Sequence, residues 1–253
     1  EVGPLGYPTG DARPVTGGAV QDFQGGTVYS SAAGTRAVAG SILTAYTAAG
    51  AQAGPLGYPT SGLVCGLRSS GCGQVFQAGR IYTTAATGTH AVSGPIQDAW
   101  IAQGWETAAL GYPTGDQVCG LAGGGCRQTF EGGSLYTSPA TGTFPVTGRI
   151  GAAWSTAGAQ DGTLGYPVSG LICGLRDGGC GQVFQGGRVY STAASGVHSV
   201  SGPIQDAWIA QGWETGTLGY PVSEPVAVPG GTAQDFQGGR LTLDTTTGAV
   251  TRG

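Results

Sequence analysis

Three residue types are missing from this 253-residue sequence, which contains no lysine, no asparagine and no methionine. Charged residues make up only 9% of the chain, and all ten basic residues are arginine. The net charge is −4 and basic residues form no cluster, so we exclude nucleic acid as a partner, because phosphate binding needs clustered Lys and Arg. No apolar run is long enough for a membrane-spanning helix, so we expect no membrane insertion.

Glycine and proline, in contrast to charged residues, are abundant, with 52 and 14 residues respectively. Such a composition is typical of disordered chains. Hydrophobic residues nevertheless reach 40%, and the chain has five Trp and ten Tyr, which supply apolar surface for a packed core. We therefore expect a folded protein with an uncharged polar surface, which suits neutral ligands such as glycans.

The sequence consists of five repeats. The string Leu-Gly-Tyr-Pro recurs at offsets of 51, 54, 54 and 54 residues, starting at Leu5, Leu56, Leu110, Leu164 and Leu218. A Gln-x-Phe marker follows in each repeat, and a Gly-x-Ile-x-x-Ala-[Trp/Tyr] marker occurs four times. Fixed order of three markers predicts one domain, residues 1–253, of tandem repeats. Their approximate ranges are 5–55, 56–109, 110–163, 164–217 and 218–253.

Each repeat reads as a β-hairpin, a short strand and a helix, so the fold class is an α+β repeat protein. In repeat 4 the Gly186-Gly187 pair predicts the hairpin turn, and Pro203 predicts a helix start. The helical spacing places Trp208 on a buried face. We expect Tyr46, Trp100, Trp154 and Trp208, and the Phe of each Gln-x-Phe marker, to lie in the core. We expect the five tyrosines of the turns to pack between repeats with a free hydroxyl.

One repeat cannot bury enough surface alone, so neighbouring repeats must complete its core. The residues themselves allow an open solenoid or a closed ring. Five turns and five hairpins alternate with only four helices. Either a fifth helix lies outside this chain, or its absence marks the seam of a ring.

Six cysteines occur in equivalent positions of repeats 2, 3 and 4, always with the spacing C-x6-C. This repetition favours local disulfides over the other pairings that six cysteines allow. The expected pairs are Cys65–Cys72, Cys119–Cys126 and Cys173–Cys180. A zinc site needs four ligands at one place, so we expect no metal. Paired disulfides predict a secreted, extracellular location.

Catalysis is not expected. The sequence has no Gly-x-Ser-x-Gly or His-Glu-x-x-His motif, and a phosphate loop is impossible without lysine. We therefore predict neither enzymatic activity nor a cofactor. Asp22 and Asp235 occupy equivalent positions and could form a glycosidase-like pair only if repeats 1 and 5 met at a ring seam. Solvated strand residues are the simpler interpretation.

Two aromatic–acidic pairs favour ligand binding. Trp105-Glu106 and Trp213-Glu214 follow the helices of repeats 2 and 4, and an aromatic plane beside a carboxylate suits a sugar. The alternative is that both tryptophans pack against the next repeat. Arg80 and Arg188 follow the hairpin turns and either reach a ligand or are simply solvated.

These markers resemble the LGFP repeat, named for Leu-Gly-Phe-Pro, over essentially the whole chain. The resemblance implies secreted actinobacterial proteins in which such repeats accompany mycoloyltransferases, esterases or peptidoglycan hydrolases. It implies cell-wall binding, with arabinogalactan as the favoured ligand, and a pseudo-five-fold assembly. Phe of the family motif is Tyr in all five turns here.

The family's Thr-Gly-x-His and its Glu after the helix survive only in repeats 2 and 4, so we expect those repeats to hold the intact sites. The predicted glycan-binding residues are His90, Arg80, Trp105, Glu106, His198, Arg188, Trp213 and Glu214.

We thus predict a monomeric, closed, propeller-like ring of five units with pseudo-five-fold symmetry. Its function is to bind cell-wall polysaccharide without catalysis, arabinogalactan before peptidoglycan, and to anchor a secreted protein or a fused or associated envelope enzyme. The alternative is a structural or protein-interaction scaffold of the envelope that binds no glycan.

Overall fold

The computed structural model describes residues 4–253. The chain divides into two compact parts, residues 1–118 with 127–132 and residues 119–126 with 133–253. The boundary falls inside repeat 3. Repeats 1 and 2 therefore belong to the first part, and repeats 4 and 5 belong to the second.

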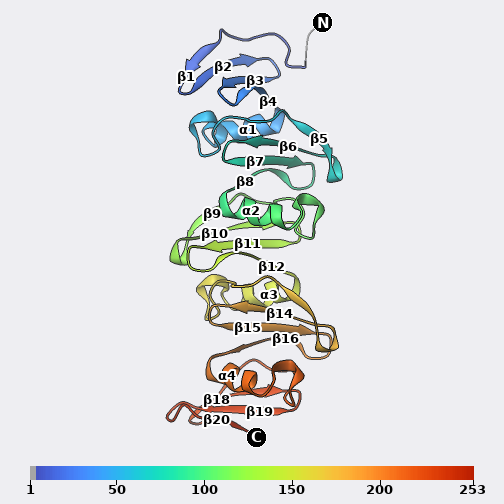
Figure 1. Ribbon diagram of the computed structural model, residues 1–253, viewed down its shortest axis with the longest axis vertical. Coiled ribbons are helices and arrows are strands. Elements are labelled where there is room, and N and C mark those ends of the chain that lie inside the picture. The colour runs from blue at the N-terminus through green and yellow to red at the C-terminus, as the bar shows by residue number, and fades with distance from the viewer. Residues whose placement is uncertain (1–3) are drawn as a thin grey trace. The chain divides into compact units, whose positions relative to one another are not determined.

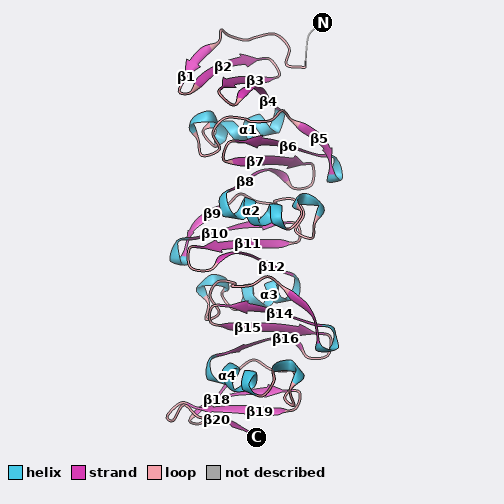
Figure 2. Ribbon diagram, viewed as in Figure 1, coloured by secondary structure: helices cyan, strands magenta, loops and turns pink. Residues whose placement is uncertain are grey.

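Each repeat forms its own four-stranded sheet, in which the strands follow chain order as an antiparallel meander. The first four repeats each continue into one α-helix (Figures 1 and 2). The predicted hairpin, third strand and helix are confirmed. The sequence interpretation missed the first, outer strand of each sheet.

Strands and helices keep nearly the same lengths from repeat to repeat. Repeat 1 contains β1 (Arg13–Val15), β2 (Gly18–Phe23), β3 (Gly26–Ser31), β4 (Gly34–Ala39) and α1 (Gly40–Ala48). Repeat 2 contains β5 (Val64–Leu67), β6 (Gly71–Phe76), β7 (Gly79–Thr84), β8 (Gly88–Ser93) and α2 (Gly94–Ala102). Repeat 3 contains β9 (Val118–Leu121), β10 (Gly125–Phe130), β11 (Gly133–Ser138), β12 (Gly142–Thr147) and α3 (Gly148–Thr156). Repeat 4 contains β13 (Ile172–Leu175), β14 (Gly179–Phe184), β15 (Gly187–Thr192), β16 (Gly196–Ser201) and α4 (Gly202–Ala210). Repeat 5 contains β17 (Val226–Val228), β18 (Gly231–Phe236), β19 (Gly239–Asp244) and β20 (Val250–Arg252).

Each helix ends at a glycine in the left-handed conformation, such as Gly212 with φ 96°. Glycine is favoured there because it has no Cβ to clash with the preceding turn. A single 3-10 turn follows, η3 (Trp105–Thr107) in repeat 2 and η7 (Trp213–Thr215) in repeat 4. This turn places the predicted Trp-Glu pairs directly after the helix.

The aromatic residue of each helix joins its repeat to the next one. Trp208 of α4 is 0% exposed, and its ring lies 6.0 Å from that of Phe236 in repeat 5. Its Nε1 donates a hydrogen bond of 2.8 Å to the carbonyl of Gly219, in the Leu-Gly-Tyr-Pro turn. Trp100, Trp154 and Tyr46 make the same bond to the corresponding glycine carbonyl. The predicted core role of these residues is confirmed.

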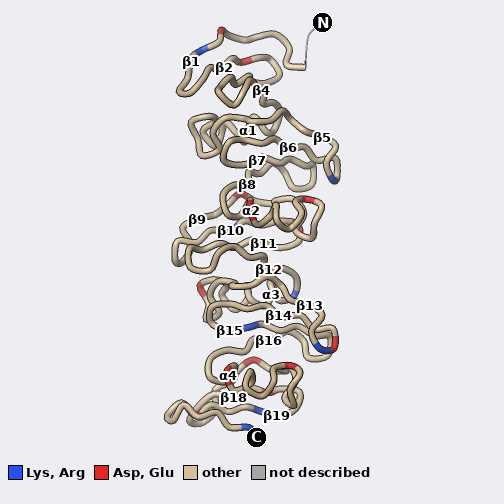
Figure 3. Tube along the Cα trace, in the orientation of Figure 1, with Lys and Arg blue, Asp and Glu red and all other residues tan. Residues whose placement is uncertain are grey.

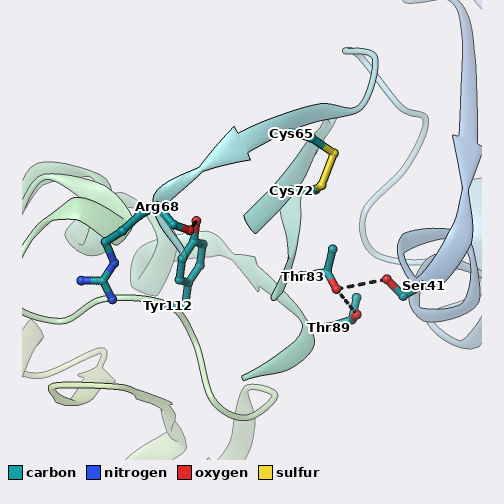
Figure 4. The surroundings of a disulfide bond; sticks show 7 residues. All are labelled: Ser41, Cys65, Arg68, Cys72, Thr83, Thr89 and Tyr112. Carbon is teal, nitrogen blue, oxygen red and sulfur yellow. Dashed lines mark hydrogen bonds between the residues drawn. A yellow bond between two sulfur atoms is a disulfide. The ribbon is translucent and has the colours of Figure 1, made fainter. Parts of the chain in front are cut away.

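The tyrosine of the turn reaches back in the opposite direction. The hydroxyl of Tyr220 donates to the carbonyl of Arg176 in repeat 4, at 2.7 Å. Tyr112 beside Arg68 makes the equivalent bond at 2.9 Å (Figure 4). Tyr58 and Tyr166 do the same. The prediction of a free hydroxyl was therefore wrong in repeats 2 to 5, because each hydroxyl donates to a backbone carbonyl of the preceding repeat.

The three predicted disulfides are confirmed. In repeat 2, Cys65 and Cys72 are direct cross-strand partners of β5 and β6, so their bond ties the outer strand to the sheet (Figure 4). Repeats 1 and 5 form the same outer strand without cysteine. Disulfides of this kind fit a secreted or extracellular protein.

The predicted closed ring was wrong. The five sheets are separate, and none closes into a ring or a propeller. Helix α1 packs on its own β4 and on β7 and β8 of the next repeat, and α3 and α4 contact the following repeats in the same way. Such head-to-tail contacts need only sequence neighbours, so they bury each helix without closure.

Charged residues are sparse along the Cα trace (Figure 3). Among the helices between residues 4 and 253, none is long and apolar enough to cross a membrane.

Replacing Tyr112 and Tyr220 by Phe tests the backward hydrogen bonds. Each loss should lower the free energy of unfolding by about 1 kcal/mol at neutral pH. Burial raises the pKa of each tyrosine from 10.0 to about 12. The unfolded chain therefore loses these protons at a lower pH than the folded chain, and the free energy of unfolding falls as the pH rises from 10 to 12. Urea unfolding across this range should show a shallower decline for the double Phe variant. An equal slope would contradict the assignment.

Replacing Cys65 and Cys72 by Ser tests the contribution of one disulfide. The residues lie 7 apart in sequence, and a loop this short should contribute roughly 2.5 kcal/mol through the unfolded state. We expect a loss of that size in urea unfolding with the β5–β6 pairing retained, as in the cysteine-free repeats 1 and 5. Loss of the far-ultraviolet circular dichroism signal would show instead that the bond is needed for folding.

Candidate functional site

A cation–π pair dominates the end of repeat 4. The guanidinium of Arg188 on β15 lies over the indole of Trp213 in η7, 4.4 Å from the ring centroid. Tyr190 lies on the same strand, and burial raises its pKa while the charge of Arg188 lowers it. The face of Trp213 that was expected to stack on a sugar therefore carries an arginine.

The backbone at Trp213 is unusual. Its φ is 59°, a left-handed value that is disfavoured for bulky side chains. Ala51 and Ala159 occupy the same position in repeats 1 and 3, both with φ 51°. Strain of this kind persists where the surrounding structure enforces it and is frequent at functional sites. The fold imposes this backbone conformation whether the residue is tryptophan or alanine. The indole is therefore not needed to form the turn, and its role lies in its side-chain contacts.

Arg188 and Trp213 border a hollow of about 260 Å³ that lies wholly within repeat 4. Glu214, only 9% exposed, lies in its wall, so three predicted site residues come together here. The outer strand contributes Ile172 and Leu175, an apolar side. The remaining lining residues are Gly181, Gln182, Val183, Tyr190 and Thr215.

One buried polar atom at this hollow has no hydrogen-bond partner, the Nε of Arg188. The side chain of Gln182 lies on the opposite face of the sheet, because its cross-strand partner is Val189 whereas that of Arg188 is Val183. On that face its Nε2 donates to the carbonyls of Pro145 and Ser169 at 2.7 and 2.9 Å. Leaving a buried polar group unsatisfied costs about 1–3 kcal/mol. The hollow thus offers one donor to a ligand.

The same arrangement recurs in repeat 2. Arg80 lies 4.3 Å from the centroid of Trp105, and Glu106 is 8% exposed. Here too the Nε of Arg80 is buried without a partner. The site therefore exists once in each compact part of the chain.

Repeats 1 and 3 lack all three side chains together. Thr27, Ala51 and Gln52 stand in repeat 1, and Ser134, Ala159 and Gln160 stand in repeat 3. The buried glutamine is still present in repeat 3, as Gln128, with an unpartnered Oε1. In repeats 1 to 4, Arg, Trp and Glu are thus either all present or all absent, which indicates one shared role.

Repeat 5 shows what happens to the arginine without the tryptophan. Arg240 donates from Nε to Asp235 at 2.6 Å and from Nη2 at 2.8 Å. Asp235 is its direct cross-strand partner, whereas the partner of Arg188 is Val183 and that of Arg80 is Val75. An apolar cross-strand partner therefore leaves the arginine Nε available in repeats 2 and 4.

The predicted histidines lie in a different contact. His198 approaches Ser195 O at 2.8 Å with Nε2 and Glu224 of repeat 5 at 3.3 Å with Nδ1. His90 makes matching contacts to Thr87 O and Asp116, both at 2.9 Å. Both ring nitrogens are thus engaged, and the histidines connect consecutive repeats.

The two carboxylates of the glycosidase hypothesis are engaged in local pairs. Asp22 pairs with Arg13 and accepts from Thr27. The hydrogen bond from Arg240 lowers the pKa of Asp235. A general acid needs a raised pKa, so Asp235 is poorly suited to that role.

Wider grooves of about 640 and 350 Å³ lie beside α1 and α3. The walls of the first are mainly small side chains and hydroxyls, and Asp116 in its lining is already bound by His90. The smaller hollow of repeat 4 therefore has the stronger ligand-binding chemistry.

Sequence reasoning missed four residues at the hollow: Gln182, Tyr190, Ile172 and Leu175. Gln182 and Tyr190 belong to markers found in most repeats, so they carried no signal of a special role. Ile172 and Leu175 flank a cysteine, and only the cross-strand disulfide reveals which wall they form.

A search of curated proteins finds no match to the sequence. Among solved structures, two match the whole or nearly the whole chain, both of them extracellular domains of candidate signalling systems of B. thetaiotaomicron. The one-component system is 10% identical with a TM-score of 0.17, and this chain spans 39% of it. The hybrid two-component system is 11% identical with a TM-score of 0.17, over 97% of this chain and 36% of that one. At such scores neither structure supports a conclusion about this protein.

A family model, described as the LGFP repeat, matches five successive segments. They are residues 5–54, 56–107, 110–162, 164–216 and 218–252. These segments cover nearly all of the sequence, so the chain belongs to the LGFP repeat family.

Proposed function

We propose that this chain is a non-catalytic module that binds an envelope polysaccharide and holds a secreted protein at the cell wall. The observation that carries the proposal is the hollow of repeat 4, where the guanidinium of Arg188 lies over Trp213 and its buried Nε has no hydrogen-bond partner. Its counterpart in repeat 2 has the same residues.

The chemistry of the hollow suits a glycan. Sugar hydroxyls both donate and accept, so one sugar can satisfy the donor of Arg188 together with the carboxylate acceptor of Glu214. Trp213 acts as a platform that fixes the guanidinium, which reduces the ordering cost on binding. The low content of charge on the remaining surface favours a neutral polymer.

The family resemblance favours arabinogalactan as this polymer, with peptidoglycan second. Two sites on one chain suit a repetitive ligand, because the second site binds at the effective concentration set by the first. Weak individual sites can therefore hold a protein firmly on a wall polymer.

A protein-interaction scaffold is the alternative, and exposed apolar side chains favour it. Val64 and Ile172, on the outer strands β5 and β13, are 54% and 49% exposed. Clustered exposed apolar side chains often mark protein interfaces.

Conversion of both sites to the sequence of repeat 3 tests the proposal. The variant carries Arg80→Ser, Trp105→Ala and Glu106→Gln with Arg188→Ser, Trp213→Ala and Glu214→Gln, all residues that the fold already accepts. Co-sedimentation with purified arabinogalactan and with peptidoglycan should show retention of the parent chain and at least tenfold weaker retention of the variant. Conversion of one site alone should give an intermediate loss.

Arg149→Ser serves as the control, because it removes an exposed arginine outside both sites. Its retention should equal that of the parent, and thermal unfolding should show that all variants are folded. Failure of the parent to bind either polymer would favour the scaffold. Equal retention of the parent and the converted variant would place binding elsewhere on the chain.

A further inference from the structure

Helices α1, α3 and α4 are each received by the same four positions of the following repeat. In repeat 2 these positions form one buried cluster with Ile42 and Tyr46 of α1, and they are Leu56, Tyr58, Phe76 and Ile81. The equivalent residues of repeats 4 and 5 bury α3 and α4 in the same way. Figure 1 shows α1 between the sheets of repeats 1 and 2. Each of these sheets therefore presents one face to the helix that precedes it.

Repeat 1 has the same face, which we name the acceptor face, formed by Leu5, Tyr7, Phe23 and Val28. Consecutive strand residues point to opposite sides of a sheet. Tyr29 packs on Tyr46 of α1, so Val28 lies on the side away from that helix. Tyr7 is 63% exposed, against 6% for Tyr58. The other three residues are partly exposed, whereas their counterparts in repeats 2 to 5 are all buried.

The turn of repeat 1 already has the conformation that receives a helix. Gly6 has a φ of 71°, and the equivalent glycines of repeats 2 to 5 have φ between 64° and 68°. The N–H of Tyr7 donates to Oε1 of Gln24 at 3.1 Å, a bond that the glutamine or glutamate at this position repeats in every later turn. Pro8 pairs with Phe23 as in the other four turns. A preformed surface of this kind lowers the ordering cost of binding.

The hydrogen-bonding groups of the acceptor face also match a repeat junction. In repeat 2 the carbonyl of Gly57 accepts from the hydroxyl of Tyr46, and the hydroxyl of Tyr58 donates back to a carbonyl of repeat 1. Among residues 4–253, no aromatic N–H or O–H reaches the carbonyl of Gly6, because the four helix aromatics bond the glycines of repeats 2 to 5. The face therefore suits a partner that brings such a donor together with apolar side chains.

We propose that the acceptor face of repeat 1 binds the aromatic helix of another polypeptide of the LGFP repeat type. That helix presents an isoleucine and, four residues later, a tryptophan or tyrosine, as Ile42 and Tyr46 do in α1. Its apolar side chains cover Phe23 and Val28, and its ring N–H or O–H donates to the carbonyl of Gly6. A second copy of this chain cannot supply the helix, because all four helix aromatics are already buried in their own chain.

A peptide with the sequence of residues 202–216, which contains α4, tests the interaction. Free peptides of this length form little helix, so a lactam joins Asp206 to a lysine introduced by Ala210→Lys, at two positions that are exposed in α4. Isothermal titration should show that this peptide binds the chain. The same peptide with Trp208→Ala should bind about tenfold more weakly or less, because an aromatic anchor contributes most of such an interface.

Substitutions at Tyr7 test the location. Because this side chain is exposed, Tyr7→Ser should leave thermal unfolding unchanged. It should reduce peptide binding about fivefold or more, whereas Tyr7→Phe retains the ring and should bind within about twofold of the parent. Val64→Ser is the matched control, because it removes another exposed apolar side chain, 54% exposed on the outer strand β5. This control should bind the peptide as the parent does.

Several results would overturn the inference. They are absence of binding by the bridged peptide, equal binding of the Trp208→Ala peptide, and a loss in Val64→Ser equal to that in Tyr7→Ser. Sedimentation equilibrium should show a monomer in the absence of peptide. Self-association that Tyr7→Ser abolishes would identify a second copy as the occupant, and the partner assignment would then be wrong. The variant with both glycan sites converted should bind the peptide like the parent, so this inference and the proposed function fail independently.

Discussion

The constraint on which the structure depends is that no repeat can cover its own helix. A nine-residue helix with one large aromatic side chain buries that side chain only when the next repeat supplies a phenylalanine and a turn. The indole of Trp208 needs both an apolar contact and an acceptor for its N–H, and the Leu-Gly-Tyr-Pro turn of repeat 5 provides the acceptor. The glycine is required in this turn because its φ is positive, 66° at Gly219, and a Cβ there would collide with Gln237. The Leu-Gly-Tyr-Pro motif thus supplies the hydrogen-bond acceptor for the aromatic side chain of the preceding helix.

Tyrosine in place of the family's phenylalanine strengthens the same junction. A phenylalanine would fill the space between repeats, but the hydroxyl of Tyr220 also satisfies the carbonyl of Arg176, which lies in a tight turn outside the sheet. Contact between consecutive repeats therefore runs in both directions, with the helix reaching forward and the tyrosine reaching back. The carbonyl of Arg176 already accepts a backbone N–H in its 3-10 turn, so the tyrosine hydroxyl occupies its second lone pair.

Spacing in the sequence predicted the hairpins, the helices, the aromatic core and the three disulfides, because each follows from local turn chemistry or from repetition at one position. It led to a closed ring, which was wrong, since head-to-tail repeats can form an open array or a closed ring from the same local contacts. Trp213 and Glu214 were identified because an aromatic residue beside a carboxylate suits a sugar, and Arg188 because it follows a hairpin turn. Val183 was not identified, because it looks like any strand residue. Its place opposite Arg188 depends on cross-strand register, which composition and spacing do not reveal.

Alternate repeats show that the site is separable from the fold. Repeats 1 and 3 have alanine where repeats 2 and 4 have tryptophan, at the same left-handed backbone position. Trp213 packs edge-to-face on Trp208, with 6.0 Å between the ring centroids, and the arginine that it holds brings a buried donor without a partner. The unpaired donor opposes stability in the unbound state, and a ligand that pairs with it would offset that loss. Selection for binding explains this combination better than selection for folding, because the chain folds the same unit twice without it.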